Sequence, residues 1–319
     1  MNLTREQRTE QALFRGGSLT LDNHPYRVTV CTFLSTLFRD DATPADLTGK
    51  ALEMAGRDVN AVVISRESGA VAGLDEFCYF ARGYGLDVSL EKRDGDAIQA
   101  KETLLQVKGP EGKILAFERV GLNLLQRMSG IATAARCLQE LARHTGASAR
   151  VVGTRKTPWG MLDKRALHVG GAGTHRLGLG DAILIKNNHL VLIAPSEEDA
   201  APVAIEKAWN LRREAAFIEI EVRGENAARA AAASFRRLQD RAPGEYPCLL
   251  LLDNMTPGQI GAIAAMLKKE GLWDCVLLEA SGGISAANME EYAAAGVDAI
   301  SIGALTHSAR ALDLCLRIL

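Results

Sequence analysis

The second half of the sequence predicts an α/β fold built on a parallel sheet. Short apolar runs recur there, at residues 150–154, 182–186, 217–222, 249–253, 276–280 and 298–303. Alanine-rich stretches with helical character, such as 225–240 and 256–270, separate most of these runs. Because the runs are continuous rather than alternating, we expect strands that are covered on both faces. About six strand–helix units indicate an incomplete TIM-like barrel, with a doubly wound open sheet as the main alternative.

The first half of the chain shows mixed elements without a regular repeat. We expect residues 1–50 to be irregular, with a turn at 21–25 and an acidic stretch at 40–48. The patterns that follow predict, in order, a strand–turn–strand at 60–73, a helix at 75–85, a hairpin around residues 109–112 within 101–118, and a helix at 113–144.

Composition limits the class of protein. The chain has 319 residues, of which 47% are hydrophobic, and a formal net charge of −2. This charge balance does not favour a nucleic-acid partner, so any anion site must be a local cluster. The six cysteines form no C-x-x-C pair, which argues against a structural zinc site and a disulfide framework. Because no signal segment and no bilayer-length apolar stretch is found, we expect a cytoplasmic protein without a membrane partner.

Polar side chains follow the predicted strands at the point where each strand ends. Arg155 and Lys156 follow the first run, and Lys186 follows the second. The next three runs end near Glu221, Asp253 and Glu279, and the last two strand ends carry Ser281, Gly282, Gly283, Gly303 and His307. Since all strands of a β/α barrel end on one face, these cations and carboxylates are expected to share one mouth. Glycines ahead of helix N-termini favour a phosphate group there.

Each of these features has a simpler explanation when taken alone. Lys186 could lie along the surface, and Asp253 could begin a helix. His168, His175 and His189 could be read as a metal cluster, but their spacing fits no common helix-borne zinc pattern. Charged groups at nearly every strand end are harder to explain by packing, because an unpaired buried charge is costly. The combination therefore indicates a binding site for anions.

The order of the motifs resembles that of one enzyme family, quinolinate phosphoribosyltransferase, also called carboxylating nicotinate-nucleotide pyrophosphorylase. The resemblance rests on GTRKT, GGAGTHRLGLGDAILIKNNH, IEIEV, LLLDN, EASGGI and SIGALTHS. It extends to residues 118–137 and, more loosely, to DDATPADLT and SRESGAVAGL. It covers residues 40–319 and is strongest over 118–307.

The resemblance implies an α/β fold with two domains. A small N-terminal α/β sandwich domain would span residues 1–122, with a C-terminal helix at 309–319 packed on it, and an incomplete TIM-like barrel would span 123–308. The family forms homodimers, or higher homo-oligomers, whose active sites are shared between subunits. The implied reaction joins quinolinate to phosphoribosyl pyrophosphate in the presence of Mg²⁺. It releases pyrophosphate and CO₂ and gives nicotinate mononucleotide, a step of NAD biosynthesis.

The resemblance also assigns roles to residues at the strand ends. Catalytic roles are implied for Lys156, Lys186, Glu221 and Asp253, and the last two are also implied to bind Mg²⁺, directly or indirectly. The dicarboxylate would contact Arg155, Lys156, His175, Arg176 and Lys186, with Arg119 from the partner subunit. The phosphoribosyl and phosphate groups would contact Glu221, Asp253, Ser281, Gly282, Gly283, Gly303 and His307. A flat dianion with adjacent carboxylates suits several guanidinium and ammonium groups.

The sequence departs from the family pattern beside the implied acceptor pocket. The segment Pro158–Lys164 is shorter than in the family and lacks an arginine. Gly153, Ala172 and Thr174 stand where the family has an aspartate, a glycine and an asparagine. These departures bear on the identity of the acceptor more than on the class of reaction.

A non-catalytic phosphoribosyl or nucleotide sensor is disfavoured, because phosphate binding alone has no use for Glu221 and Asp253. Two further alternative functions stay open. One is a phosphoribosyltransferase for another acidic heteroaromatic acceptor, as in the family branch associated with molybdenum-transport gene clusters. The other is a barrel aldolase in which Lys186 forms a Schiff base, which requires a lysine with a lowered pKa in a dry pocket.

Overall fold

The computed structural model describes residues 3–42, 46–54, 56–242 and 246–319, which divide into two compact units. The first unit comprises Met1–Arg15, Cys137–Lys156 and Ala172–Ala304. The second comprises Gly16–Arg136, Thr157–Gly171 and Leu305–Leu319. The change from one unit to the other falls inside helix α5 (Glu111–His144), and the domain boundary at residue 122 stays a prediction.

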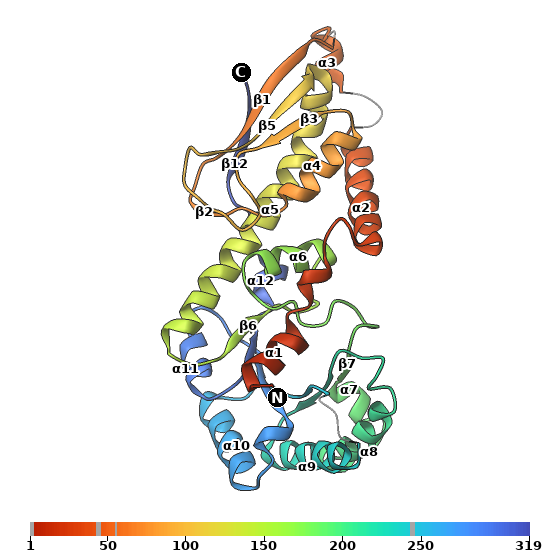
Figure 1. Cartoon of the computed structure of the whole chain (residues 1–319), viewed down its shortest axis with the longest axis vertical. Coiled ribbons are helices and arrows are strands. Elements are labelled where there is room, and N and C mark those ends of the chain that lie inside the picture. The colour runs from red at the N-terminus through yellow and green to blue at the C-terminus, as the bar shows by residue number, and fades with distance from the viewer. Residues whose placement is uncertain (1–2, 43–45, 55, 243–245) are drawn as a thin grey trace. The chain divides into compact units, whose positions relative to one another are not determined.

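A six-stranded parallel sheet forms the centre of the first unit (Figure 1). Its strand order is β6-β11-β10-β9-β8-β7, and every neighbouring pair is parallel. The strands are β6 (Arg150–Val152), β7 (Ile183–Ile185), β8 (Ile218–Val222), β9 (Cys248–Asp253), β10 (Leu277–Ser281) and β11 (Ala299–Ser301). Each strand lies on one of the six apolar runs, so the predicted parallel α/β fold is confirmed.

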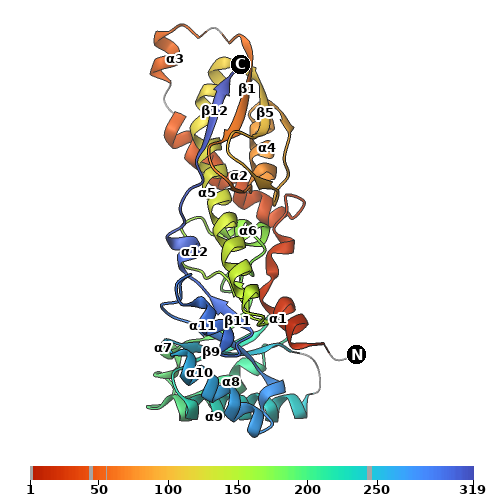
Figure 2. The same ribbon diagram turned by 90° about the vertical axis from the view of Figure 1, so that its left-hand side faces the viewer.

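Helices lie along the outside of this sheet (Figures 1 and 2). They are α7 (Asn187–Leu190), α8 (Glu197–Trp209), α9 (Glu225–Arg241), α10 (Pro257–Lys269), η2 (Trp273–Cys275) and α11 (Met289–Ala294). Helix α9 buries an alanine-rich face that ends at Phe235, and a capping box between Thr256 and Gln259 begins α10. The helices predicted at 225–240 and 256–270 are therefore confirmed.

Helix α1 (Arg5–Leu13) packs against the ends at which the strands begin. Its last residues, Ala12 and Leu13, are wholly buried. They belong to one apolar cluster with Val152, Ala182, Phe217, Leu249, Leu277 and Ala299. Four of these residues stand first in a strand or just before one, at Ala182, Phe217, Leu277 and Ala299. The N-terminal helix thus fills the apolar end of the sheet interior.

The sheet is open between its two outer strands, β6 and β7, in the part of the chain that is described. A short segment after Gly171 runs beside β6, where Gly173 pairs in parallel with Val152. The Gly153 N–H donates to the Gly173 carbonyl at 2.9 Å, and the His175 N–H donates to the Leu13 carbonyl at 2.9 Å. An irregular segment thus stands where a closed barrel would have a further strand, and the incomplete TIM-like barrel is confirmed.

The second unit contains an antiparallel sheet of order β12-β1-β5-β3 and a separate pair, β2 with β4. The strands are β1 (Asp58–Ser65), β2 (Gly69–Ala70), β3 (Asp87–Leu90), β4 (Ala97–Ile98), β5 (Thr103–Pro110) and β12 (Leu314–Ile318). The expectation of a C-terminal helix at 309–319 was wrong. Residues 314–318 form β12 because Ala61 to Ser65 of β1 offer an edge for antiparallel pairing.

The helices of the second unit are α2 (His24–Ala42), α3 (Leu47–Ala51), α4 (Leu74–Gly83), α5 up to Arg136, α6 (Met161–Val169) and α12 (Ala304–His307), with a 3₁₀ turn η1 (Arg15–Ser18) at its start. Aromatic rings join the helices: Phe117 on α5 contacts Phe77, Phe80 and Tyr84, and Phe38 on α2 contacts Phe80 and Tyr84. Residues 43–45 of the acidic stretch lie outside the described residues.

Two further expectations for the first half of the chain were wrong. The first 50 residues hold the helices α1 and α2 and the start of α3, because Thr4 caps α1 and buried Tyr26, Val30 and Leu34 give α2 an apolar face. The hairpin around residues 109–112 is a strand that runs straight into a helix, with β5 ending at Pro110 and α5 beginning at Glu111. The expected helices at 75–85 and 113–144 are confirmed as α4 and α5.

None of the helices among the described residues combines the length and apolar character needed to cross a bilayer.

Truncation of Leu13 should destabilise the barrel unit. Leu13→Ala removes a wholly buried side chain from the apolar cluster, which typically costs about 2–5 kcal/mol. Leu211→Ala is the matched control, because Leu211 is 52% exposed and its truncation should cost about 0.5 kcal/mol or less. Urea titrations of both variants give the free energies of unfolding. A loss at Leu13 no larger than at Leu211 would contradict the role assigned to α1.

Candidate active site

The side chains that face the sheet interior form layers along the strands. Residues two apart point to the same face of a strand. Phe217 belongs to the apolar cluster beneath α1, Glu219 two residues later is wholly buried, and Glu221 two residues after that lies at the end of β8. The same layers recur on β10 with Leu277, Glu279 and Ser281. The strands thus pass from an apolar base through a buried acidic layer to a polar mouth.

The sheet register brings the predicted strand-end residues to one edge. Ile185 pairs with Ile220, so Lys186 follows β7 beside Glu221. Asp253 pairs directly with Ser281. The segment 154–156 follows β6, and Gly303 lies beyond the end of the neighbouring strand β11. Cations from the two outer strands therefore flank carboxylates and glycines from the inner ones.

Three cations at this edge form no ion pair among the residues that the structure describes. Arg155, Arg176 and Lys186 have no carboxylate oxygen within the 4.0 Å of an ion pair there. Burial lowers the pKa of the Arg176 guanidinium, and so does the positive charge of nearby Arg155, while Glu219 opposes both. Guanidinium groups that repel one another are stabilised by an anion between them. This pair is the strongest electrostatic sign of an acidic ligand.

The two carboxylates at the mouth are held by an arginine that sequence reasoning missed. Arg223 Nη2 lies 2.9 Å from Glu221 Oε1 and 3.4 Å from Asp253 Oδ2. The carboxylates are mostly buried, with 12% and 17% of their side chains exposed. The signal that was available is spacing, because Arg223 stands two residues after Glu221 and points to the same side of the strand. Glu221 and Asp253 thus lie close enough to act on one ligand.

A tight turn follows β10 and fixes the glycines of the predicted phosphate site. Gly282 and Gly283 have φ angles of +98° and +62°. A Cβ on Gly282 would stand 2.2 Å from Asn254 Oδ1, whereas a Cβ on Gly283 would meet nothing within 4 Å. Asn254 itself has φ +56°, its N–H donates to the Ser281 carbonyl at 2.9 Å, and its Nδ2 donates to Asp253 at 2.8 Å. Asn254, also missed from the sequence, joins the glycine turn to the acidic residues.

Beneath the mouth, His175 is enclosed by two buried glutamates. Its Nε2 lies 2.9 Å from Glu219 Oε2 and 3.3 Å from Glu279 Oε2. Its Nδ1 accepts the Arg176 N–H at 2.7 Å, and its own backbone has φ +53°. Both ring nitrogens therefore have partners inside the barrel. The bond to Nδ1 ties the backbone of Arg176 to the buried acidic layer.

The charge state of this cluster follows from opposing effects. Burial disfavours imidazolium, but the carboxylates of Glu279 and Glu219 outweigh it and raise the pKa of His175 to about 10. Burial and the charge of Glu279 raise the pKa of Glu219 to about 7, although His175 and Arg176 act against them. The raised pKa favours a ring protonated on both nitrogens, whereas the bond from the Arg176 N–H needs an unprotonated Nδ1. The hydrogen-bond geometry therefore corresponds to the neutral ring with its proton on Nε2 and opposes the effect of the two carboxylates.

Two sets of side chains could hold a metal ion. His175, Glu219 and Glu279 form the one group of three or more potential ligands that lie within 4.8 Å of one another among the described residues. Glu221 and Asp253 offer oxygen atoms at the mouth itself, where a ligand can reach them. Hard oxygen donors of this kind suit Mg²⁺ better than an imidazole-containing set does.

The departures from the family pattern are accommodated by interactions of their own. In the second unit, wholly buried Asp163 accepts two hydrogen bonds from Arg127, at 2.8 and 2.7 Å, and one from Thr157. The Trp159 ring packs at a tilt against Phe33 and lies under the Arg127 guanidinium. These contacts fix the short segment before α6 without the arginine that the family has there.

The departure at Thr174, in the first unit, concerns the barrel interior. Its hydroxyl accepts the Arg15 N–H at 3.0 Å and donates to the His175 carbonyl at 2.9 Å. The side chain is wholly buried. Thr174 therefore faces α1 and supports the backbone of His175 from within.

The two remaining predicted residues belong to the second unit. Arg119 lies on α5 with 57% of its side chain exposed. Its Nη2 is 3.9 Å from Glu118 Oε1. His307 ends α12, and its Nδ1 lies 2.6 Å from Ser308 Oγ.

An incomplete α/β barrel with unpaired cations, carboxylates and a glycine turn at one edge defines a class of enzyme that binds acidic and phosphorylated small molecules. Two family models match the chain: quinolinate phosphoribosyl transferase, C-terminal domain, over residues 131–317, and the N-terminal domain of the same enzyme over 46–129. The chain belongs to the quinolinate phosphoribosyltransferase family.

Individual relatives are similar over most of the chain. The probable carboxylating nicotinate-nucleotide pyrophosphorylase of Methanothermobacter thermautotrophicus is 36% identical over 285 residues, which cover 88% of this chain and 96% of that protein. The human carboxylating nicotinate-nucleotide pyrophosphorylase is 33% identical over 293 residues, covering 91% and 92%. The structure of the Francisella tularensis nicotinate-nucleotide pyrophosphorylase matches with a TM-score of 0.78 at 27% identity, covering 92% of this chain and 96% of that one.

Alanine at the two adjacent glycines should separate backbone strain from steric conflict. Both substitutions place a side chain at positive φ, which costs about 1–2 kcal/mol. Gly282→Ala should lose about 1–3 kcal/mol more, because its Cβ would collide with Asn254. Urea unfolding of the two variants measures the difference. Equal losses would show that Asn254 moves away freely and does not fix the turn.

Proposed function

We propose that this chain transfers the phosphoribosyl group of phosphoribosyl pyrophosphate to quinolinate, with loss of CO₂, to give nicotinate mononucleotide. One observation carries the proposal. The neighbouring guanidinium groups of Arg155 and Arg176 have no carboxylate partner among the described residues, and they lie at the edge that also holds Glu221 and Asp253. A site that combines excess cations on one side with carboxylates on the other suits an acidic acceptor and a ribose donor.

The acceptor would lie against the outer strands. Two adjacent carboxylates of quinolinate match the guanidinium groups of Arg155 and Arg176 and the ammonium groups of Lys156 and Lys186. Arg176 is largely buried and cannot be neutralised by solvent counter-ions as an exposed arginine can. His175 acts here by holding the Arg176 backbone in place, because both of its ring nitrogens already have partners.

The donor would lie over the inner strands. The glycine turn at Gly282 and Gly283, with Ser281 and Gly303, would receive the 5′-phosphate, since glycine allows backbone N–H groups to approach an anion. His307 is assigned to the same phosphate, as the family resemblance implies. Glu221 and Asp253 would hold the ribose hydroxyls and Mg²⁺, which would offset the negative charge of the pyrophosphate.

The reaction needs two changes at the substrates. The pyridine nitrogen forms a bond to ribose C1 as pyrophosphate leaves with the electron pair of the C1–O bond, and positive charge develops at C1. Glu221 and Asp253 stabilise this charge electrostatically. The pyridinium ring then accepts the electrons left when the adjacent carboxylate departs as CO₂, and a proton takes the vacated position. The barrel residues thus bind, orient and stabilise charge, and no organic cofactor takes part.

Two alternatives can be weighed against the geometry. Another acidic heteroaromatic acceptor remains a second candidate, because the segment Pro158–Lys164 is held by Asp163 and Trp159 in place of the family arginine. The Schiff-base aldolase is disfavoured, because Lys186 is exposed, whereas a lysine of that kind requires a dry pocket. A cytoplasmic location stays a prediction, and the six cysteines, all free, agree with a reducing compartment.

Quinolinate should support pyrophosphate release from phosphoribosyl pyrophosphate, and nicotinate should do so far more weakly. One carboxylate would leave part of the cation cluster without a partner, which disfavours its binding. Release of pyrophosphate and CO₂ should be measured with Mg²⁺ and a panel of pyridine acids. Equal turnover of the two acids would reject a dicarboxylate site, and a preference for a different acid would favour the second candidate.

The proposal includes a homodimer, or a higher oligomer, in which Arg119 enters the active site of the partner subunit. Its exposure and its long 3.9 Å contact with Glu118 leave it available for that role. Arg119→Ala and Lys186→Ala should each be nearly inactive alone. Because a two-fold interface exchanges equivalent patches, a mixed dimer has one site with both defects and one with neither. Co-refolding equal amounts should restore roughly a quarter of wild-type activity, since half of the dimers are mixed.

Tandem affinity tags on the two variants would verify that mixed dimers form. If they form and activity does not rise above that of the single variants, Arg119 serves its own subunit and the shared site is rejected. If Arg119→Ala alone keeps nearly full activity, the residue is only a surface partner of Glu118, whose exposed ion pair contributes little.

A further inference from the structure

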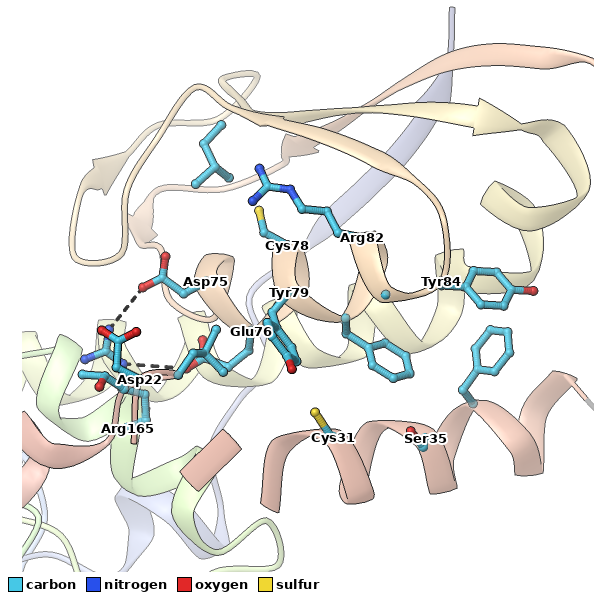
Figure 3. Close-up of a pocket in the computed structure, with 16 residues that line it drawn as sticks. Asp22, Cys31, Ser35, Asp75, Glu76, Cys78, Tyr79, Arg82, Tyr84 and Arg165 are labelled. Atoms are coloured by element: carbon cyan, nitrogen blue, oxygen red, sulfur yellow. Dashed lines mark ion pairs between the residues drawn. The ribbon is translucent and has the colours of Figure 1, made fainter. Parts of the chain in front are cut away.

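The second unit contains a cavity that the proposed reaction does not use. Its volume is about 1100 Å³, which is large enough for a small organic molecule. It lies between α2 and α4, and Arg165 of α6 closes one end (Figure 3). All of its lining residues belong to the second unit. None of the residues assigned to quinolinate or phosphoribosyl pyrophosphate lines it.

One wall of this cavity comes from a part of the chain that the family models do not cover. Helix α2 spans His24–Ala42, whereas the match to the N-terminal domain model begins at residue 46. Cys31, Ser35 and Phe38 of this helix line the cavity opposite α4. The match to the family models therefore does not include this wall of the cavity.

The end of the cavity at α6 has more acidic groups than basic ones. Arg165 lies 3.6 Å from Asp75, 3.8 Å from Glu76 and 3.5 Å from Asp94. These distances are long for charge-assisted hydrogen bonds, which are normally near 2.8 Å. One guanidinium thus stands among three carboxylates and does not bind any of them tightly. Exposed Asp22 adds a further carboxylate to the lining.

Buried polar atoms at this end lack hydrogen-bond partners among the described residues. They are Glu76 Oε2, Asp94 Oδ2 and Arg165 Nε. Glu76 is only 1% exposed, and its other oxygen accepts from the Tyr26 hydroxyl at 2.7 Å. The other oxygen of Asp94 accepts the Leu74 N–H at 2.9 Å. Two acceptor atoms are therefore left over for one donor, so a ligand group here must mainly donate hydrogen bonds.

The pKa values of the buried carboxyl groups also favour a cationic ligand. Burial raises the pKa of Glu76, and burial together with the charge of Glu76 raises the pKa of Asp94 to about 7. Burial is the largest cause of both pKa shifts, and the nearby Arg165 offsets it only in part. A cation placed beside them would stabilise their ionised forms.

The rest of the lining is mainly apolar and aromatic, with Arg82 as a further charged group. Figure 3 shows Tyr79 and Cys31 between the acidic end at Glu76 and the aromatic end at Tyr84. Phe80 belongs to the aromatic end, which suits a flat ring or a hydrocarbon chain.

We propose that the cavity between α2 and α4 is a binding site for a small organic cation with an aromatic body. An amidinium or ammonium group would donate to Oε2 of Glu76, which lines the cavity, and the body would lie against Cys31 and Tyr79. The site is separate from the reaction, so its test does not depend on the proposed function.

Calorimetric titration of the full chain with three matched probes tests the proposal. Benzamidine, benzamide and benzoate share one ring and carry a positive, a neutral and a negative group. Benzamidine should bind, benzamide should bind at least roughly tenfold more weakly, and benzoate should not bind. Absence of benzamidine binding, or equal binding of benzamide, would overturn the proposal.

Three variants locate the bound probe. Glu76→Gln keeps the size of the side chain and its bond to Tyr26, and it should weaken benzamidine binding by roughly tenfold or more. Ser35→Trp, at an exposed lining position, should fill the cavity and abolish binding. Thr36→Trp is its control, because Thr36 is an exposed neighbour on the same helix that does not line the cavity.

The tryptophan pair decides the matter even if Glu76→Gln fails to fold. Circular dichroism first confirms that both tryptophan variants are folded. Loss of binding in Ser35→Trp with wild-type affinity in Thr36→Trp supports the site. Unchanged binding in Ser35→Trp would place benzamidine elsewhere, for example at the carboxylates of the barrel mouth, and would reject the site.

Discussion

Repulsion between like charges at the edge of the parallel sheet is the constraint around which the barrel mouth is organised. Arg155 and Arg176 come from separate segments, and the charge of the first lowers the pKa of the second. The fold tolerates this because the groups are held by elements that are stable for other reasons: β6 pairs with β11, and Arg176 follows a residue locked inside the barrel. An anion bound between the two guanidinium groups would relieve this repulsion, as the proposed substrate site requires.

The buried acidic layer explains why Arg176 stays in place. Glu219 and Glu279 are costly to bury, and His175 compensates by presenting Nε2 to both of them. The same ring accepts the Arg176 N–H, so a single imidazole connects the interior of the barrel to the mouth. Leu13 supports His175 from the end at which the strands begin. It packs in the apolar cluster there, and its carbonyl accepts the His175 N–H.

The cavity in the second unit differs from the barrel mouth in the sign of its excess charge. At the barrel mouth positive charge is in excess, whereas around Arg165 negative charge is in excess. Unsatisfied groups at both places mark where a ligand would lower the free energy, but the ligands have opposite charge. The cavity also depends on α2, a helix outside the segments that the family models match.

The sequence by itself determined the parallel strands, the long helix α5 and the set of polar residues at the strand ends. Continuous apolar runs and helical spacing are local signals, and a parallel sheet necessarily brings its strand ends to one edge. Tertiary structure alone decided that residues 314–318 become a strand, because pairing with β1 links positions far apart in the sequence. It also decided the partners of His175, Arg223 and Asn254, and the surroundings of Arg165. Such contacts depend on which distant side chains the fold places together, and no local pattern encodes them.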